Sequence, residues 1–441
     1  MRVLIVNYRH FVSSGPERYM FNIRRLLEAR GHEVVPFSVA YRQNQDDAWA
    51  PYFVPPIAGD GEIYFREHTW TPRSLGRALS RTFYSQEVYR ALSLLLEDAR
   101  PDVALVLCYL RKMSPSVLTA LRDHGVPTVV RLSDFSMVCP GAHLTRNGRV
   151  CTECVGRLPW ASVKHGCVRG SRMVSAVDAL AVAYHRGAHM FDLVDAFVTP
   201  TNVLRDTVIE GGCDGARVRV IPTPVAIPSS ETGQQGGRDV FVYVGRIDRL
   251  KGVFTLVDAQ SRVVARHGAR APMLVFVGDA DGPDGTALRA RVEELGLQRH
   301  VHFEGVQDLQ GIETWFGRAI ACIVPSLWFE NLPNSLLEAL AAGVPIVAAD
   351  QPGLREALTG SDAAILVPPG DAVALGAAMG DLVDDSVRLV AMSVAARRLA
   401  RERFSEETHV SALEGLFHEV LALRHPSSSP ASSEQPGSGL S

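Results

Sequence analysis

Residues 325–350 read PSLWFENLPNSLLEALAAGVPIVAAD. The apolar run that leads into this stretch predicts a buried strand, which a polar loop follows. The spacing then predicts a helix over Ser335–Ala342, with Asn334 as its N-cap and Gly343 as its stop, and a second strand over Pro345–Ala349. A strand, a helix and a strand in this order form the βαβ unit of a parallel sheet.

The same alternation of short apolar runs and helical patterns extends in both directions along the chain. It stops at residues 222–238, PTPVAIPSSETGQQGGR, where no period is left, so we interpret this stretch as a linker. The alternation predicts an α/β domain on each side, with a parallel sheet covered by helices. These domains are expected at 1–221 and 239–405, followed by a helix at 406–425 and a disordered tail at 426–441.

Twelve strands are predicted within these bounds, and two long helices, 371–383 and 386–423, are predicted to close the chain. The strands are Val3–Val6, Glu33–Phe37, Val103–Leu107, Pro127–Arg131, Ala196–Thr199, Arg217–Ile221, Val240–Val244, Met273–Val277, His302–Glu304, Ile320–Val324, Pro345–Ala349 and Ala364–Val367.

The 441 residues have a net charge of −3 and include seven cysteines. This charge gives no sign of the basic surface that nucleic-acid binding needs, so we expect no such partner. The first apolar run is too short for a signal peptide, and no stretch approaches the roughly 20 apolar residues of a membrane span. We therefore expect a cytoplasmic protein without a disulfide framework, and peripheral contact with the inner membrane face stays open.

Two carboxylates flank the start of the helix predicted at Ser335–Ala342. Glu330 lies in the loop before it and Glu338 lies one turn inside it. Amides at a helix N-terminus can bind phosphate or sugar oxygens, and carboxylates accept hydrogen bonds from the hydroxyls of a sugar or ribose. Ligands of doubly wound sheets bind at the carboxyl ends of the strands, so this end of the second domain is the expected ligand site.

A second motif opens the second domain. VGRIDRLKG, residues 244–252, follows a predicted strand, and its Arg246 and Lys251 flank a tight turn. An arginine fork and a lysine point charge in this arrangement could clamp a diphosphate. Lys251 is one of only three lysines in the chain, which favours a specific task for it.

The chain resembles the retaining glycosyltransferases of family 4, which have the GT-B fold. The resemblance rests on VGRIDRLKG, on the seven residues between Glu330 and Glu338, and on NYRHFVSSGPERYMFNIRRLLEARGHEVVPFS at residues 7–38. It covers the chain to about residue 423. It implies two Rossmann-like domains that face each other across a cleft and a nucleoside diphosphate sugar as donor.

The resemblance also implies roles for single residues. Arg246 and Lys251 would neutralise the diphosphate. Glu330 would contact the donor sugar, and Glu338 would hold the ribose. Asp134, at the end of a first-domain strand, completes the candidate catalytic set with Glu330, Lys251 and Arg246.

Backbone contacts to the donor are implied on both sides of the cleft. The loop with Asn331, Leu332 and Asn334 would contact sugar and phosphate. Gly15, in the loop after the first strand, would approach the donor from the opposite domain, because glycine allows close backbone approach.

The chain departs from the family pattern after the strand predicted at Pro127–Arg131. Many relatives carry a His-Asp pair there, whereas this chain has Ser133 before Asp134. Three alternatives stay open for the acceptor hydroxyl: Asp134 serves it, another group such as His143 serves it, or the leaving phosphate of the donor acts as base. Asp134 could also be a turn or cap residue.

A cysteine cluster marks residues 139–170 as an insertion in the first domain. Cys139, Cys151, Cys154 and Cys167 have the spacing C-x11-C-x2-C-x12-C. Four thiolates can complete a zinc tetrahedron, and a small insertion with few apolar residues needs such a cross-link. The sequence therefore favours a structural zinc ion, with free thiols as the alternative and His165 as a competing ligand. Similar insertions occur in a subgroup of the family.

The aromatic residues Trp49, Tyr52, Phe53 and Tyr64 allow two interpretations. They could line a groove for the acceptor, or they could pack a loop, and packing is favoured.

The sequence thus predicts a metal-independent retaining transferase that moves a sugar from a nucleoside diphosphate to a hydroxyl. The acceptor would be a growing polysaccharide, a lipid-linked sugar or a small metabolite. No catalytic cofactor is expected, because Arg246, Lys251 and a helix N-terminus supply the positive charge. Two alternatives remain: a catalytically degenerate GT-B protein that acts as a docking module, and a hydrolase or epimerase that uses the same donor.

Overall fold

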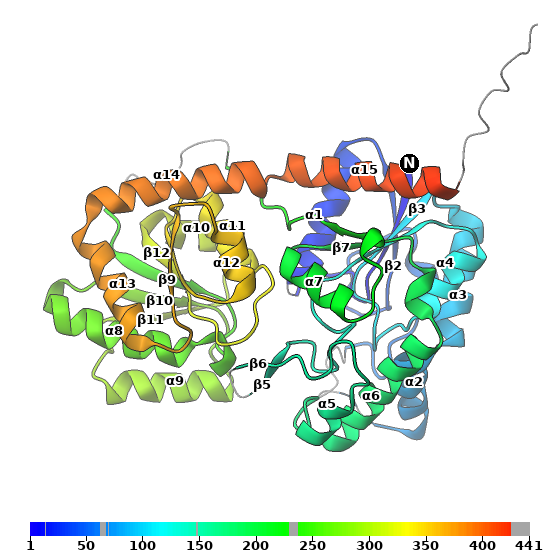
Figure 1. The fold of residues 1–441 in the computed structure, drawn as a ribbon, viewed down its shortest axis with the longest axis horizontal. Helices are drawn as coiled ribbons and strands as arrows, with labels where there is room; N and C mark the ends of the chain where they lie inside the picture. Colours follow the sequence, from blue (N-terminus) through cyan, green and yellow to red (C-terminus); the bar gives the residue numbers. More distant parts are fainter. Residues whose placement is uncertain (14, 62–67, 69, 147–148, 229–236, 425–441) are drawn as a thin grey trace, which may run out of the picture.

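The computed structural model describes residues 1–424 apart from 14, 62–67, 69, 147–148 and 229–236. Two parallel six-stranded sheets form two lobes that lie side by side, and helices cover both faces of each sheet (Figure 1). The predicted α/β fold with two Rossmann-like domains is therefore confirmed. The centre of the predicted linker and the predicted disordered tail lie outside the described residues.

The sheet of the first domain has the strand order β2-β1-β3-β4-β7-β8. Its strands are apolar and buried, as expected when helices cover both faces of a parallel sheet. The strands are β1 Arg2–Val6, β2 Glu33–Phe37, β3 Val103–Val106, β4 Thr128–Arg131, β7 Ala196–Thr199 and β8 Val218–Val220. The helices are α1 Gly15–Ala29, α2 Pro72–Phe83, α3 Gln86–Ala99, α4 Ser116–Asp123, α5 Trp160–His165, α6 Arg172–Gly187 and α7 Asn202–Glu210.

The second sheet is also parallel but has a different strand order, β11-β10-β9-β12-β13-β14, in which two strands rather than one lie beyond the first strand of the domain, β9. Its strands are β9 Val240–Val244, β10 Met273–Val277, β11 Val301–Gly305, β12 Ala319–Val324, β13 Ile346–Ala349 and β14 Ala364–Val367. Its helices are α8 Val253–His267, α9 Pro283–Glu294, α10 Leu309–Arg318, α11 Asn334–Ala341, α12 Pro352–Leu358, α13 Ala372–Asp384 and α14 Ser386–Arg403. None of the helices in the described part of the chain is both long and apolar enough to cross a membrane.

The chain closes on three helices, so the single helix predicted at 386–423 is wrong. It is divided at Phe404 and Ser405 into α14 and α15, Glu406–Arg424. The amide of Val225, where the chain first leaves the first domain, donates to the carbonyl of Phe404. α15 then runs back over the first domain (Figure 1), and its apolar side joins the core beneath β1 and α1.

The insertion at 139–170 forms a small hairpin, β5 Thr145–Arg146 and β6 Arg149–Val150, followed by α5. α5 packs against α6, and α6 packs against α2. The helices α2, α5 and α6 lie together at the lower end of the first domain (Figure 1).

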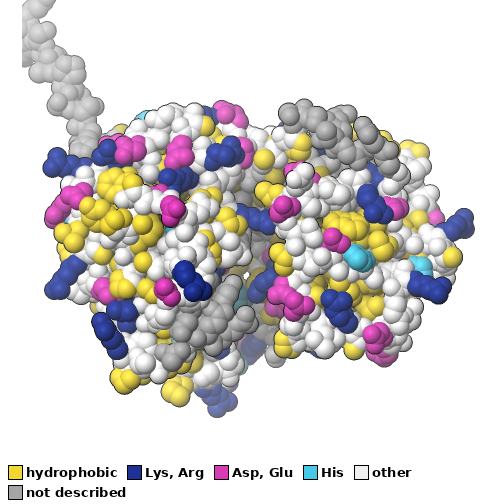
Figure 2. Space-filling model, turned by 180° about the vertical axis from the view of Figure 1, so that it is seen from behind, with side chains coloured by type: hydrophobic (Ala, Val, Ile, Leu, Met, Phe, Trp, Pro, Cys, Tyr) yellow, Lys and Arg dark blue, Asp and Glu magenta, His cyan; other side chains and the backbone are white. Residues whose placement is uncertain are grey.

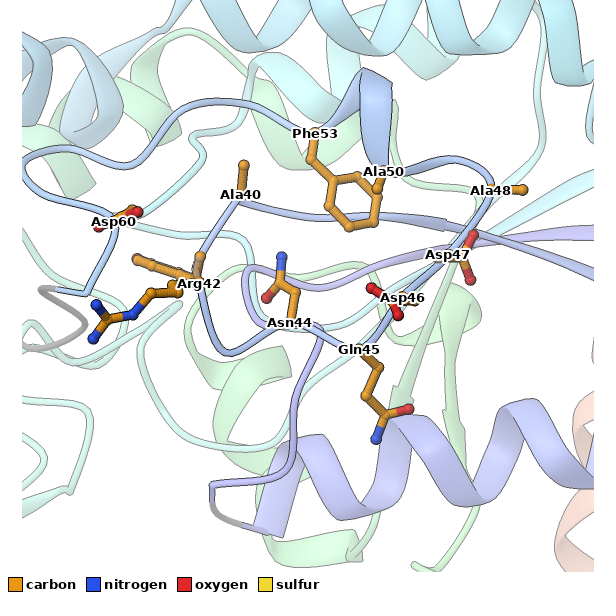
Figure 3. Close-up of a pocket in the computed structure, with 11 residues that line it drawn as sticks. Ala40, Arg42, Asn44, Gln45, Asp46, Asp47, Ala48, Ala50, Phe53 and Asp60 are labelled. Carbon is orange, nitrogen blue, oxygen red and sulfur yellow. The ribbon is translucent and has the colours of Figure 1, made fainter.

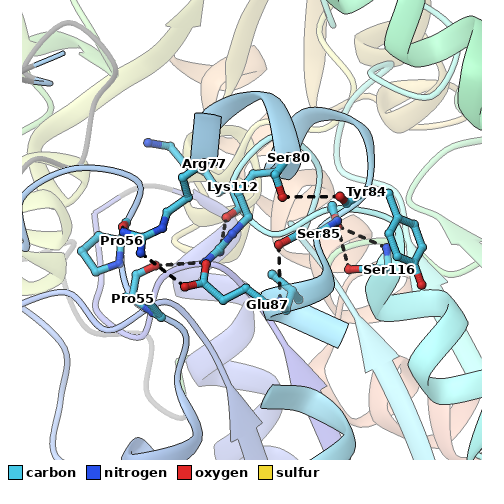
Figure 4. Close-up of polar contacts among 12 residues, drawn as sticks. Pro55, Pro56, Arg77, Ser80, Tyr84, Ser85, Glu87, Lys112 and Ser116 are labelled. Atoms are coloured by element: carbon cyan, nitrogen blue, oxygen red, sulfur yellow. Dashed lines mark hydrogen bonds and ion pairs between the residues drawn. The ribbon is translucent and has the colours of Figure 1, made fainter. Parts of the chain in front are cut away.

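A buried arginine fixes α2 to the rest of the domain. The Arg81 guanidinium is completely buried. It donates to the carbonyls of Lys112 and Pro55 and forms an ion pair of 2.7 Å with Glu87 of α3, among the contacts drawn in Figure 4. The orientation of α2 is therefore set from three directions.

Candidate active site

The residues predicted to bind the donor converge where the two lobes meet. A groove separates the lobes in Figure 2. Lys251 ends a short 3-10 turn, Arg249–Lys251, after β9. Gly252 follows with φ of 75°, and a Cβ there would lie 1.9 Å from the carbonyl oxygen of Pro325 at the end of β12. Only glycine fits this approach, so it holds the two donor motifs side by side.

Lys251 and Glu330 form an ion pair of 2.6 Å between Nζ and Oε1. The same carboxylate oxygen accepts a hydrogen bond of 2.6 Å from the hydroxyl of Ser326. Glu330 is only 6 % exposed. A buried carboxylate needs such partners, since an unpaired buried charge is strongly destabilising. The two residues assigned to the diphosphate and the sugar thus occupy one site.

Arg246 and Trp328 extend this site toward solvent. Arg246 is exposed, and its guanidinium forms no ion pair with any described residue. Its Cζ lies 5.7 Å from the centroid of the Trp328 ring, and Lys251 Nζ lies 4.5 Å from the same centroid. The buried indole N–H of Trp328 has no hydrogen-bond partner in the described part of the chain. The site thus contains a guanidinium without an ion-pair partner, that of Arg246, and an indole N–H without a hydrogen-bond acceptor, that of Trp328.

Two helix N-termini face each other across the cleft. α11 begins at Asn334 and α1 begins at Gly15. A Cβ on Gly15 would lie 3.1 Å from the side-chain nitrogen of Asn334. Asn334 was predicted as the N-cap of α11, and this is wrong: the N-cap is Pro333, and no side chain caps the helix. The first amides of α11 therefore keep the partial positive charge that attracts anions.

Glu338 lies on α11 and reaches the opposite domain. Its Oε1 accepts a hydrogen bond of 2.9 Å from Arg18 Nη1 of α1, while its buried Oε2 has no partner among the described residues. Burial raises the pKa of Glu338, and the nearby Arg18 lowers it. The Oε2 atom is therefore a hydrogen-bond acceptor without a partner, and a ribose hydroxyl could donate to it. Sequence reasoning missed Arg18, because only the fold brings it to Glu338.

The loop from Asn331 to Asn334 joins the domains rather than facing an open space. Asn331 donates to the carbonyl of Ser133 over 3.3 Å and accepts from the hydroxyl of Thr201 over 2.7 Å. Leu332 packs beside the core of the second domain. The side chain of Asn331 is therefore occupied within the protein, and a donor would meet the loop mainly through its backbone.

Asp134 and His143 lie on the first-domain side of the site. Asp134 is exposed, and its carboxylate accepts a hydrogen bond of 2.8 Å from the amide of Ser136, which makes it a turn residue. The His143 ring stacks on Trp328, with centroids 4.6 Å apart and an angle of 26° between the planes. Loss of hydration lowers the pKa of His143; Asp134 raises it, and the cations Arg246, Arg111 and Lys251 lower it further.

A second contact joins the insertion to the loop between β12 and α11, which we call the donor loop. The amide of Phe329 donates to the hydroxyl of Thr145 in β5 over 3.0 Å, and the Phe329 ring packs edge-on against Phe135. Thr145 gave no signal in the sequence, because the contact bridges 184 positions.

The four predicted zinc ligands lie near one another. A Cβ on Gly141 would lie 3.7 Å from Cys139 Sγ and 3.6 Å from the Cβ of Cys167. Burial and the neighbouring thiols, among them Cys139 and Cys151, raise the pKa of Cys154 to about 11. Within the described residues, however, no three His, Cys, Asp or Glu side chains are arranged to share a metal ion. The competing ligand His165 contacts Arg146 and Glu153 instead, and zinc binding stays a prediction.

A cavity of about 650 Å³ lies in the first domain between residues 40 and 60. Arg42, Asn44, Asp46 and Phe53 line it, as Figure 3 shows. Of the aromatic residues singled out in the sequence, only Phe53 lines this cavity among those described, and Trp49 and Tyr52 pack beside the core. Packing is thus the main role of Trp49 and Tyr52, while Tyr64 lies outside the described residues.

Each half of the chain matches a family model. Residues 14–224 match the glycosyl transferase 4-like domain, and residues 238–385 match the glycosyl transferases group 1. The chain joins two glycosyltransferase domains. Neither match tests the cysteine-rich subgroup, which stays a prediction.

Relatives and solved structures agree with this assignment. The chain is 33 % identical to the 2-deoxystreptamine N-acetyl-D-glucosaminyltransferase of Streptomyces fradiae, over 46 % of this chain and 50 % of that enzyme. It is 27 % identical to the glycogen synthase of Mycobacterium tuberculosis, over 93 % of each chain. The chain thus spans about half the length of the first relative.

Among solved structures, the fold is similar to that of HepE from Anabaena in complex with UDP, with a TM-score of 0.62 and 16 % identity, over 95 % of this chain and 100 % of that one. At this identity the likeness concerns the fold, which is that of GT-B glycosyltransferases.

Proposed function

We propose that the protein is a retaining glycosyltransferase that moves a sugar from a nucleoside diphosphate to a hydroxyl acceptor. One observation carries the proposal: Lys251, Glu330 and the unpaired Arg246 meet beside two facing helix N-termini. Two cations and the oriented amides of a helix N-terminus can bind a diphosphate, and a carboxylate beside them can accept hydrogen bonds from the hydroxyls of a sugar. The UDP bound to the similarly folded HepE supports a nucleotide donor.

The positive charge of this site makes a divalent cation unnecessary for the proposed reaction. As the glycosidic bond of the donor breaks, negative charge grows on the diphosphate. Arg246, Lys251 and the amides of α11 are fixed before the reaction and stabilise that charge without reorganisation. A structural zinc ion at the four thiols would not take part in this step.

The acceptor would enter from the first domain. We propose that it is a growing polysaccharide, a lipid-linked sugar or a small metabolite. The polar cavity near Asn44 and Asp46 offers hydrogen-bond partners for hydroxyls. Three versions of the mechanism differ in the group that accepts the proton of the acceptor hydroxyl: Asp134, His143 or the donor phosphate. The stacking of His143 on Trp328, beside Lys251, favours His143.

Two alternatives make different predictions. A docking protein with a degenerate site would bind no donor, whereas Arg246, Lys251, Glu330 and Glu338 are all present and converge. A hydrolase or epimerase would turn over the donor without an acceptor. Donor turnover that requires an added hydroxyl compound would exclude both.

A thermal-shift panel of nucleotide sugars tests donor binding. A ligand at about 100 times its Kd stabilises the folded chain by about 2.7 kcal/mol. We expect Glu338→Ala to weaken the binding of the selected donor by about 10- to 100-fold, because a hydrogen bond to a charged group contributes about 1.5–3 kcal/mol. Glu294→Ala, which removes an exposed carboxylate on α9, is the matched control. No shift with any nucleotide sugar would contradict the proposal.

The pH profile of transfer tests His143. Its pKa is lowered, so the ring stays neutral to below the ordinary value of 6.5 and can accept a hydrogen bond from the acceptor hydroxyl. The rate should fall as the pH falls through this lowered pKa. This fall in rate at low pH is the acid limb of the profile. In His143→Gln the acid limb should disappear, and the maximal rate should drop by about 100-fold. An unchanged acid limb in the variant would assign the limb to another group, such as Asp134.

A further inference from the structure

α6 carries an apolar stripe on its solvent side. Met173, Leu180 and Tyr184 are 78, 50 and 44 % exposed. With the half-buried Val177 they occupy positions i, i+4, i+7 and i+11, which share one face of a helix. An apolar stripe of about three helical turns on the solvent side needs a reason, since single exposed apolar residues are common but continuous patches are not.

The two neighbouring helices continue this surface. α5 begins with Trp160, which is 47 % exposed, and α2 presents Leu75 and Leu79 to solvent. The Tyr184 ring lies 6.1 Å from that of Phe83 at the end of α2, so the helices are in contact. We call the outward side of α2, α5 and α6 the foot surface. The lower end of the molecule in Figure 2 shows hydrophobic and basic side chains together.

The charged side chains that α2, α5 and α6 themselves expose are positive, and the neighbouring Glu153 is paired with Arg146 and His165. Arg73, Arg157, Lys164 and Arg172 are exposed, and none forms an ion pair with a described residue. Elsewhere on the molecule many exposed arginines form ion pairs, for example Arg266 with Asp381. α2 and α5 contain no acidic residue, and the single one of α6, Asp178, is buried and pairs with Arg111. A chain with a net charge of −3 thus has a local cationic surface.

We propose that the foot surface binds an anionic lipid bilayer. Cations without partners, an apolar stripe and interfacial Trp and Tyr side chains are the combination by which amphipathic helices lie in the headgroup region. Each Lys or Arg near an anionic bilayer strengthens binding about fivefold.

A comparison within the chain supports this choice. α14 also exposes apolar side chains, Val387, Val390 and Val394. Its start, however, lies beside exposed Asp384 and Asp385, and it carries no aromatic residue. Because Arg388 is exposed in the first turn of α14, the charges there are mixed, and an anionic surface would favour the foot surface over this helix.

The insertion connects the foot surface to the candidate active site. Its first part contains His143 and Thr145, which contact Trp328 and Phe329, and its last part contains α5, which packs against α6. If the proposed transfer is correct, docking would bring a lipid-borne acceptor to the side of the cleft where His143 lies. The bilayer contact itself does not rest on the proposed function.

Vesicle sedimentation with the full chain tests the proposal. We expect binding to vesicles of phosphatidylcholine with 30 % phosphatidylglycerol, weak binding to phosphatidylcholine alone, and loss at high salt. Lys164→Gln with Arg172→Gln should weaken binding about 25-fold, from fivefold per charge. Met173→Asn with Leu180→Asn should also weaken it, while Val387→Asn with Val390→Asn should not.

Binding that is equal on neutral vesicles, absent on both, or unchanged in the foot variants would overturn the proposal. Absence on both would leave an acidic protein as the partner of this surface. The nucleotide-sugar thermal shift is measured on the same variants. It should stay at the wild-type value, so that failure of the bilayer contact and failure of the transferase assignment are told apart.

Discussion

Replacement of Lys251 by alanine is expected to slow sugar transfer by about 100- to 1,000-fold. The Nζ atom lies 2.6 Å from Glu330, beside the helix N-terminus where the diphosphate would bind. A fixed cation there stabilises the leaving group more in the transition state than in the ground state, so kcat should fall more than KM rises. Steady-state kinetics with the donor chosen by the thermal-shift panel measures this.

The loss of Lys251 also leaves a buried carboxylate without its cation. Removing one partner of a buried pair can cost about 3–5 kcal/mol of stability, so a folding defect must be separated from a catalytic one. Lys251→Met with Glu330→Gln removes both charges and should fold, yet stay inactive. Arg249 lies two positions away on the same turn, pairs with half-buried Asp284 and lies over the Phe254 ring. Arg249→Ala should keep wild-type rates. Wild-type kcat in Lys251→Ala would place the active site elsewhere.

The strands were predictable because a parallel sheet covered on both faces needs short apolar runs. Glu33–Phe37, Ala196–Thr199, Val240–Val244, Met273–Val277 and Ala364–Val367 have the predicted bounds. The donor motifs were predictable for a related reason. Their residues lie next to strand ends, and strand ends in such sheets meet at one edge.

Contacts between the two domains were not predictable from local patterns. Asn334 has the residue type of an N-cap, yet its side chain lies against Gly15 of the other domain. Arg18 and Glu338 are 320 positions apart, and no spacing links them. Trp328 lies inside the quoted motif, but its stacking on His143 depends on how the insertion folds.

A helix at 406–425 was predicted, but the continuous helix predicted over 386–423 was wrong for a different reason. Residues 403–406 contain neither Gly nor Pro, so the helical period continues through them. The break comes from tertiary structure: Val225 pairs with Ser405, and the Ser405 hydroxyl accepts from the amide of Thr408 at the start of α15. Tertiary contacts thus override a weak local preference.

Removal of α15 is expected to abolish cooperative folding of the first domain. Val410, Leu413, Leu416, Phe417 and Val420 are at most 4 % exposed, and they complete the core around α1. Burial of each such side chain contributes about 1.5–3 kcal/mol. The sum approaches the whole stability of an ordinary domain, about 5–15 kcal/mol. A chain that ends at residue 404 should therefore be insoluble or melt without cooperativity.

Polar contacts of α15 add to this loss. His409 Nδ1 donates to the carbonyl of Pro222 over 2.6 Å, and its Nε2 accepts from the Tyr19 hydroxyl over 3.0 Å. Burial lowers the pKa of His409 to about 4. Arg424 pairs with Asp195 at the far end of the helix. Without α15 the buried hydroxyl of Tyr19 loses its His409 partner, which costs about 1–3 kcal/mol.

Calorimetry on two shortened chains and two point variants distinguishes this from a general effect of truncation. A chain that ends at residue 424 keeps all of α15 and should melt like the full chain. Phe417→Ala, at a completely buried position, should cost about 3–5 kcal/mol. Leu423→Ala, at a position that is 73 % exposed, should change stability by less than about 0.5 kcal/mol. Equal melting temperatures for the chains ending at 404 and 424 would show that the first domain folds without the helix that crosses it.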